Sequence, residues 1–380
     1  MRILIISDVS SYMRGGVPVE TKELLKGLTL RGHEVAFGAD APLCGEEVRH
    51  YTFSINGPNQ ATQLKKILAH YKPELVHVIA MGSIGLTAIA PLLRNQQWVL
   101  TCHSIPPFER KLACCHNHDK LHYALRTLRF AANTLAWKWL LRKSNIPCVI
   151  AHSRYVQNIV ENYGYQTGKS RLIPLGFKRG ESSTHAAALR TLSSSPKILT
   201  VGGIAHTKGQ HDAILAMANL KYDLPNFTYQ LIGEARDDSY LQFLNKLIDQ
   251  KGLSKHIKIT PNLDEISKQS ALQQADFYLQ PSHEEGFCLS YIEAAGIVPR
   301  LIGTDTGAIG LISADDLGMQ VVSPKSPTEI ANSIRKLAAT TLPEDLLITR
   351  NLRLEKQFSW ESYLDQHEQL YKELKLKSSM

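Results

Sequence analysis

The feature that most constrains the fold is a repeated alternation of short apolar strands with helices, in two series that a polar stretch separates. The first series opens with a strand at residues 3–7, a helix at 20–31 and a strand at 34–37, and continues with strands at 75–79, 98–101 and 148–151. A chain that alternates strand and helix in this way forms a parallel sheet with helices on both faces. We therefore predict a doubly wound α/β domain in the first half of the chain.

The second half of the chain repeats this pattern. Strand patterning is lost around residues 180–196, a polar stretch that we interpret as a linker. New strands are expected at 197–201, 228–232, 256–260, 276–279 and 300–302. A length of 380 residues also favours about two domains over a single core. We expect two Rossmann-like domains, at 1–179 and 197–356, facing a deep cleft, and a closing helix within 357–380.

Positive charge is concentrated in the first half of the chain. Residues 1–180 contain 23 Lys and Arg against 11 Asp and Glu, whereas the whole chain has a net charge of +8. Such a field favours an anionic partner, which leaves nucleic acid, a phospholipid surface and a phosphate-bearing substrate as candidates. No nucleic-acid motif accompanies the charge, so we expect no nucleic-acid partner.

Residues 110–143 hold eight Lys and Arg with a single acid, Asp119, interleaved with Leu, Phe130, Trp137 and Trp139. Helices of this composition lie on anionic membranes. A helix that packs on the core and exposes a basic face accounts for the same pattern. The 19 uncharged residues at 75–93 are long enough to span a bilayer, but a strand, a Gly/Ser turn and a helix account for them better.

The six cysteines, at 44, 102, 114, 115, 148 and 288, follow no regular spacing. We expect reduced thiols and a cytoplasmic protein. A peripheral location on the inner face of the membrane is the alternative to a freely soluble one. An apolar strand directly after Met1, interrupted by Asp8, is unlike an export signal.

The segment with Cys114, Cys115, His116 and His118 lacks the Cys-x2-4-Cys spacing of zinc sites, so we expect no metal site.

Two carboxylates, Glu285 and Glu293, lie eight positions apart where an apolar strand runs through Pro and Gly into a helix. If that helix begins near Cys288, the free amides of Cys288, Leu289 and Ser290 and the helix dipole favour a bound anion such as pyrophosphate. At 1.5 Å per residue the carboxylates would lie about 12 Å apart. That span suits a sugar, a pyrophosphate and a ribose, although a plain solvated helix also fits the pattern.

Residues 281–296 closely resemble the Glu-x7-Glu element of the family 4 retaining glycosyltransferases, which have the GT-B fold. The resemblance covers nearly the whole chain, up to the closing Phe-Ser-Trp helix. It implies that the first domain faces the acceptor, the second binds the nucleotide-sugar donor, and the end helix crosses back to the first domain. It also implies that Glu285 holds the sugar hydroxyls and Glu293 the ribose hydroxyls. Gly286 and Phe287, between them, join the donor-binding set.

A second element, at residues 202–209, ends the first strand of the second series with Gly202-Gly203 and continues to Lys208-Gly209. It resembles the family's Gly-Arg-x4-Lys-Gly element, whose basic residues meet the donor diphosphate. Lys208 matches, but Gly203 replaces the arginine. Full neutralisation of the diphosphate is then in doubt, and His206 or an arginine from elsewhere could substitute. A solvated lysine at a helix start is the alternative for Lys208.

Two further candidates follow strands of the first domain, at the edge where ligands of such sheets bind. Gly15-Gly16 opens the first helix without a Gly-x-Gly-x-x-Gly pattern, which disfavours a nicotinamide site. The family carries a matching Gly-Gly loop that faces the donor phosphates or the acceptor, although a left-handed turn before a helix needs no ligand. The resemblance places His103 beside the transferred sugar, and an exposed loop histidine is the alternative.

The resemblance implies a retaining glycosyltransferase that moves a hexose or N-acetylhexosamine from a UDP- or GDP-linked sugar to a hydroxyl acceptor, lipid-linked or a glycan under assembly. The chain contains no Asp-x-Asp, which favours metal-independent chemistry without a cofactor. We assign Glu285, His103 and Lys208 to catalysis. Two alternatives remain: a GT-B-fold nucleotide-sugar epimerase, and a non-catalytic nucleotide-sugar-binding protein, which the glycine at 203 would suit.

Overall fold

The structure is a computed structural model that describes residues 1–8, 15–43, 48–80, 85–103, 120–177, 192–235, 238–261, 263–312 and 316–378. The described residues divide into two compact units. Unit 1 comprises those within 1–108, 119–176 and 358–380, and unit 2 those within 177–357. Most of the expected linker, the zinc-like segment at 114–118, and Cys44 lie outside the described residues.

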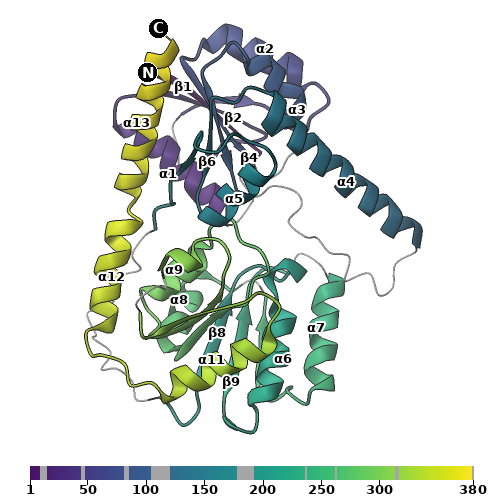
Figure 1. Ribbon diagram of the computed structural model, residues 1–380, viewed down its shortest axis with the longest axis vertical. Helices are drawn as coiled ribbons and strands as arrows, with labels where there is room; N and C mark the ends of the chain where they lie inside the picture. Colours follow the sequence, from purple (N-terminus) through teal and green to yellow (C-terminus); the bar gives the residue numbers. More distant parts are fainter. Residues whose placement is uncertain are drawn as a thin grey trace. The chain divides into compact units, whose positions relative to one another are not determined.

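Unit 1 is built on a seven-stranded parallel sheet in the order β3-β2-β1-β4-β5-β6-β7 (Figure 1). Its strands are β1 (Arg2–Ser7), β2 (Glu34–Ala39), β3 (Arg49–Thr52), β4 (Leu75–Ala80), β5 (Trp98–Cys102), β6 (Cys148–Ala151) and β7 (Ser170–Leu172). The strand order reverses between β1 and β4, which is where ligands of doubly wound sheets bind. The edge strands β3 and β7 were not expected, because they are short, partly exposed and lack an apolar run.

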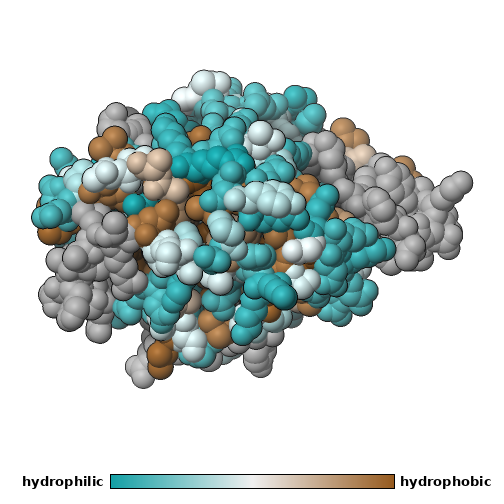
Figure 2. All heavy atoms as spheres, turned by 90° about the horizontal axis from the view of Figure 1, so that it is seen from below, coloured by the Kyte–Doolittle hydropathy of each residue, from teal (hydrophilic) through white to brown (hydrophobic). Residues whose placement is uncertain are grey.

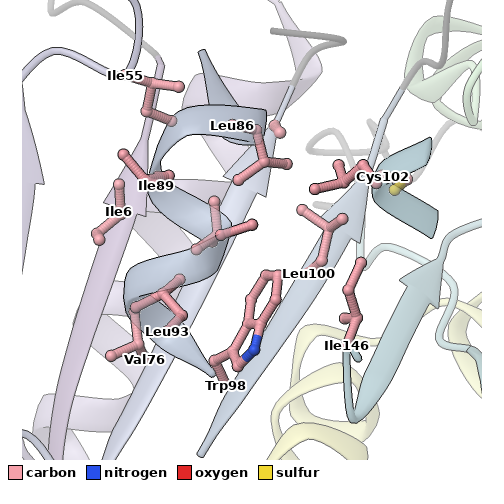
Figure 3. Packing of buried hydrophobic residues seen from close by; sticks show 14 of the residues in the cluster. Ile6, Ile55, Val76, Leu86, Ile89, Leu93, Trp98, Leu100, Cys102 and Ile146 are labelled. Atoms are coloured by element: carbon pink, nitrogen blue, oxygen red, sulfur yellow. The ribbon is translucent and has the colours of Figure 1, made fainter. Parts of the chain in front are cut away.

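Helices pack on this sheet. They are α1 (Gly16–Leu30), α2 (Gln60–Tyr71), α3 (Leu86–Ile89), the 3-10 helix η1 (Ala90–Leu93), α4 (Lys120–Lys143), α5 (Arg154–Asn162) and α13 (Trp360–Ser378). Figure 3 shows the packing under α3 and η1, where Leu86, Ile89 and Leu93 lie over the strands that carry Val76 and Trp98. All five side chains are buried. Each contributes about 1.5–3 kcal/mol of hydrophobic stabilisation when fully buried. The described residues of 75–93 form the buried strand β4 and the helices α3 and η1, as expected for a βα unit of the core.

Unit 2 contains a six-stranded parallel sheet in the order β10-β9-β8-β11-β12-β13. Its strands are β8 (Lys197–Val201), β9 (Thr228–Ile232), β10 (Ile257–Thr260), β11 (Phe277–Gln280), β12 (Arg300–Thr304) and β13 (Met319–Val322). Its helices are η2 (His206–Lys208), α6 (Gln210–Leu220), α7 (Asp238–Gln250), α8 (Glu265–Gln274), α9 (Leu289–Ala295), α10 (Ile309–Ile312), α11 (Pro327–Ala339) and α12 (Leu346–Gln357). This confirms two α/β sheets in one chain.

The closing helix α13 belongs to unit 1, as the resemblance implied. It packs so closely on α1 that a methyl group at Gly27 would lie 2.3 Å from a methyl of Leu364. It also makes a polar contact with β4, since the Tyr371 hydroxyl and the buried His77 Nδ1 lie 2.6 Å apart. The carboxyl-terminal residues are therefore part of the amino-terminal core.

Helix α12 fixes the end of α9 in unit 2. The buried guanidinium of Arg350 donates to the carbonyls of Ala295 and Val298, at 3.2 and 2.8 Å, and to the Asp316 carboxylate at 2.7 Å. A cation at the end of a helix interacts favourably with its dipole. Because α9 carries Glu293, this contact positions one of the candidate residues.

Helix α4 differs from the sequence expectation at one residue. Trp137 is fully buried in the core of unit 1, so it is not available for a membrane surface, whereas Trp139 is 45% exposed.

No helix among the described residues is long and apolar enough to cross a membrane. Figure 2 shows one face of the molecule, where hydrophilic side chains cover much of the coloured surface and hydrophobic ones lie between them. Scattered exposed apolar groups of this kind are ordinary in folded proteins.

Candidate active site

The loop between β11 and α9 carries the first candidate glutamate. Strand β11 is buried throughout and ends at Gln280, and α9 begins at Leu289. Glu285 lies in the loop itself, so the separation of about 12 Å expected from a continuous helix does not apply. Cys288, directly before α9, has a φ of 78°. This left-handed conformation costs a non-glycine residue about 1–2 kcal/mol, and such conformations cluster at functional sites.

Glu285 and Lys208 form a direct ion pair in unit 2. The Lys208 ammonium donates to both carboxylate oxygens of Glu285, at 2.7 and 2.8 Å. Two neutral donors also reach Oε1, the Ser282 hydroxyl at 2.7 Å and the Gln280 amide at 3.2 Å. The Glu285 side chain is 7% exposed and that of Lys208 is 29% exposed. The structure thus brings together two residues that the sequence assigned to separate elements.

Glu293 lies on α9 and is half-buried. Burial raises the pKa of its carboxyl group, and the Lys268 ammonium, 3.8 Å away, opposes that rise. A carboxylate with a raised pKa is one whose charge lacks full compensation from the protein. The role toward ribose hydroxyls that the resemblance implies for Glu293 stays a prediction.

Several other candidate donor-binding residues follow Glu285 along the chain, up to the first turn of α9. Gly286 and Phe287 follow Glu285 in the loop, and the Phe287 carbonyl accepts a hydrogen bond from the Ala308 amide at 2.9 Å. Leu289 and Ser290 form the first turn of α9. The loop after β12 supports them, since a methyl group at Gly307 would lie 2.9 Å from the Glu285 Cβ. These contacts hold the loop in one conformation.

Gly203 lies two residues after the end of β8, where the family has an arginine. Its carbonyl accepts a hydrogen bond from the Gln210 amide at 2.9 Å. The suggestion that His206 supplies the missing charge is not supported, because burial lowers the pKa of its imidazole. A histidine with a lowered pKa is neutral near pH 7. Lys208 is then the cation that the two sequence elements offer to a diphosphate.

His103 lies in unit 1 within a buried carboxylate–histidine cluster. It directly contacts Glu20, a fully buried residue of α1, and the Glu20 Oε1 lies 3.0 Å from the His152 Nε2. The Tyr363 hydroxyl of α13 also donates to Oε1, at 2.6 Å. His103 is only 9% exposed. The alternative of a freely exposed loop histidine is therefore wrong.

The two histidines favour the charged form of Glu20. Burial would raise the pKa of Glu20, but His103 and His152 bring it well below its usual range. Burial would lower the pKa of His152, but Glu20 and the Ile173 carbonyl raise it. Glu20 is thus a carboxylate that orients both imidazoles. Gly15, with a φ of 136°, is the N-cap of α1 and Gly16 is its first residue, so both lie about one turn before Glu20 along the chain.

Sequence reasoning missed Glu20 and His152. Both follow strand ends of the first sheet, at the start of α1 and directly after β6. Parallel strands bring their carboxyl ends to one edge, so polar residues after β1, β5 and β6 offered a usable signal. His103 and Gly15 with Gly16 belong to unit 1, and the remaining candidate residues belong to unit 2.

Comparison with known families fits this geometry. Residues 183–372 match the family described as "Glycosyl transferases group 1", and residues 14–179 match "Glycosyltransferase Family 4". The chain belongs to the family 4 glycosyltransferases. The Family 4 match covers the first half of this glycosyltransferase, and the group 1 match covers the second half.

Curated relatives of this glycosyltransferase are distant. A glycogen synthase of Mycobacterium tuberculosis (strain CDC 1551 / Oshkosh) is 25% identical over 241 residues, covering 61% of this chain and 55% of the relative. A D-inositol 3-phosphate glycosyltransferase of Segniliparus rotundus is 23% identical over 216 residues, covering 55% and 48%. The chain spans about half the length of the curated relatives it matches.

Solved structures share the fold along nearly the whole chain. A sucrose-phosphate synthase from Thermosynechococcus elongatus superposes with a TM-score of 0.76 at 21% identity, covering 98% of each chain. Anabaena HepE in complex with UDP and glucose superposes with a TM-score of 0.70 at 18% identity, covering 98% of this chain and 100% of its own. The fold is therefore GT-B.

Proposed function

We propose that this glycosyltransferase transfers a hexose or N-acetylhexosamine from a UDP- or GDP-linked sugar to a hydroxyl acceptor, with retention of the anomeric configuration. The observation that carries the proposal is the Lys208–Glu285 ion pair at the entrance to α9, followed by Glu293 on that helix. The similarity in fold to HepE, whose structure holds UDP and glucose, supports a nucleotide sugar as donor.

In this proposal the protein acts mainly through charge. Glu285 accepts hydrogen bonds from sugar hydroxyls, and Glu293 accepts them from the ribose. Lys208 stabilises the negative charge that grows on the diphosphate as the glycosidic bond breaks, which is transition-state stabilisation. The acceptor oxygen attacks the anomeric carbon as the bond to the diphosphate breaks, and the departing phosphate takes the acceptor proton. In the proposal Lys208 and backbone amides, rather than Mg²⁺, stabilise the diphosphate, and no cofactor takes part. The role beside the transferred sugar that the resemblance implies for His103 is kept as part of the proposal.

A panel of UDP, GDP and ADP sugars tests the donor. A ligand at 100 times its dissociation constant stabilises its protein by about 2.7 kcal/mol, so one nucleotide class should raise the melting temperature and the others should not. NMR of the product formed with that donor and an acceptor screen then reports the anomeric configuration. An inverted product, an epimerised donor or the absence of any melting shift would each contradict the proposal.

The acceptor in this proposal is carried by an anionic membrane. On α4 the exposed Leu128, Leu135 and Trp139 are spaced seven and four positions apart, which places them on one helical face. Arg142 and Lys143 are exposed at the end of the same helix. An apolar stripe flanked by basic residues suits the interface of an anionic lipid bilayer.

Vesicle sedimentation tests this docking. The protein should bind vesicles of anionic phospholipid at low salt, with weaker binding at high salt because of charge screening. Leu135→Ser with Trp139→Ser should release it, whereas Leu352→Ser, an equally exposed leucine of unit 2, should not. Equal binding of both variants, or no binding by the unchanged protein, would instead favour a soluble acceptor.

A further inference from the structure

Three histidines and an aspartate converge in unit 2 without a role in the proposed transfer. His206 lies in η2, His211 and Asp212 lie in the first turn of α6, and His283 lies in the loop after β11. The rings of His206 and His211 are stacked with centroids 4.7 Å apart, and the His283 ring meets them edge-on at 5.5 and 5.2 Å. Residues far apart in the sequence thus share one small volume.

The nitrogen and oxygen atoms of this cluster point at one another. The Asp212 Oδ2 lies 2.5 Å from the His283 Nε2 and 3.8 Å from the His211 Nε2. One ligand atom from each of these three residues lies within 4.8 Å of the others. In a tetrahedral zinc site with bonds of about 2.0–2.2 Å, ligand atoms lie about 3.3 Å apart. Small side-chain movements therefore convert this arrangement into a coordination sphere.

The surroundings are those of a metal site as well. Metal-binding histidines use their second ring nitrogen to bond a neighbouring group, which fixes the ring. Here the His211 Nδ1 lies 2.8 Å from the buried Tyr240 hydroxyl. Among the described residues, the buried His206 Nδ1 has no hydrogen-bond partner, and the His206 ring contacts those of His211 and His283.

The charge of the cluster also suits a cation. The Asp212 carboxylate, in contact with His283, supplies the negative charge that a dication needs.

We propose that His211, Asp212 and His283, with His206 as fourth ligand, bind a transition-metal dication of the Zn²⁺ type. Nitrogen-rich ligand sets with one carboxylate suit such ions rather than Mg²⁺ or Ca²⁺. The ion serves structure, because its ligands connect the loop of Lys208 to the loop of Glu285. These loops already touch, since the His283 amide donates to the Thr207 carbonyl at 2.8 Å.

The sequence expectation of no metal site is revised by this proposal. It rested on the cysteine spacing at 114–118, whereas the four ligands proposed here come from three separate segments and follow no zinc-like spacing. The proposal goes beyond the transfer reaction, and it leaves the diphosphate chemistry independent of Mg²⁺.

A Co²⁺ titration of tag-free, chelator-treated protein tests the site, because tetrahedral Co²⁺ has an intense visible spectrum. We expect one equivalent to bind with that spectrum and Zn²⁺ to displace it. His211→Gln with His283→Gln should lower the Zn²⁺ affinity at least 100-fold in competition with a chromophoric chelator. His256→Gln, a partly buried histidine stacked on Phe227 in the same unit, is the matched control and should keep the affinity.

Tyr240→Phe covers the case in which the double variant fails to fold. It removes the hydroxyl that fixes His211 and should lower the affinity about 10- to 100-fold. A competing group, Glu20, His103 and His152, also has ligand atoms within 4.8 Å of one another. A spectrum that survives in the double variant but is lost in Glu20→Gln would overturn the assignment. Failure of the unchanged protein to bind micromolar Co²⁺ or Zn²⁺ would also overturn it.

Discussion

The Lys208–Glu285 ion pair allows a quantitative test of the site. Hydrogen bonds to charged groups contribute about 1.5–3 kcal/mol, and removing one partner of a buried pair costs about 3–5 kcal/mol. The Lys208 side chain is 29% exposed. Solvent screening therefore brings the expected loss of stability toward the lower of these two ranges. We expect Lys208→Met and Glu285→Gln each to destabilise unit 2 by about 2 kcal/mol, with a coupling energy of about 1–2 kcal/mol in the double variant.

The tryptophans allow the two units to be followed separately during urea unfolding. All four, at positions 98, 137, 139 and 360, belong to unit 1. Tryptophan fluorescence therefore reports unit 1, while far-UV circular dichroism reports both units. The variants should shift the dichroism transition, and Lys246→Met, an exposed lysine of α7, should shift neither signal. Additivity of the two substitutions within about 0.5 kcal/mol would refute the coupling.

The same substitutions test the chemistry. Lys208→Met should lower kcat by about 100-fold or more, because a preorganised donor to developing charge contributes that much in comparable sites. Glu285→Gln should also lower kcat while preserving the loop, since the amide keeps an oxygen for the Ser282 hydroxyl. Unchanged kcat in both variants would remove the basis of the site assignment.

Three further predictions concern the carboxylates and histidines around the two sites. Glu293→Ala should raise the donor KM and leave kcat nearly unchanged, which steady-state kinetics would show. Glu20→Gln should destabilise unit 1 by about 3 kcal/mol in tryptophan-monitored urea unfolding, because a buried charge pair is broken. Burial lowers the pKa of His367 to about 4, so its stabilisation is present above the unfolded pKa of about 6.5 and is lost as pH falls below it. Between pH 7 and pH 5 this loss is about 2 kcal/mol, and His152, with its raised pKa, acts in the opposite sense. The test is therefore the difference between wild type and His367→Gln, and equal pH dependence of their urea midpoints would contradict the assignment.

Local patterns predicted most of the fold. Buried parallel strands such as β1 and β4 carry continuous apolar runs, and these can be recognised without tertiary information. The edge strands β3 and β7 lack such runs, because their stability comes from pairing with a neighbour rather than from burial on both faces. The start of α9 was recognisable from the glycine and the carboxylates before it, and the helix begins at Leu289, next to the expected Cys288.

The sequence by itself determined the two α/β sheets and the family, because these depend on periodicity and on residues close together in the chain. The donor role of the element around Glu285 stays a prediction. Only the tertiary structure decided that Trp137 is buried, that Lys208 pairs with Glu285, and that Glu20 contacts His103. These contacts join residues from separate strand ends. Parallel strand order, which no local pattern encodes, brings such ends to a single edge of the sheet.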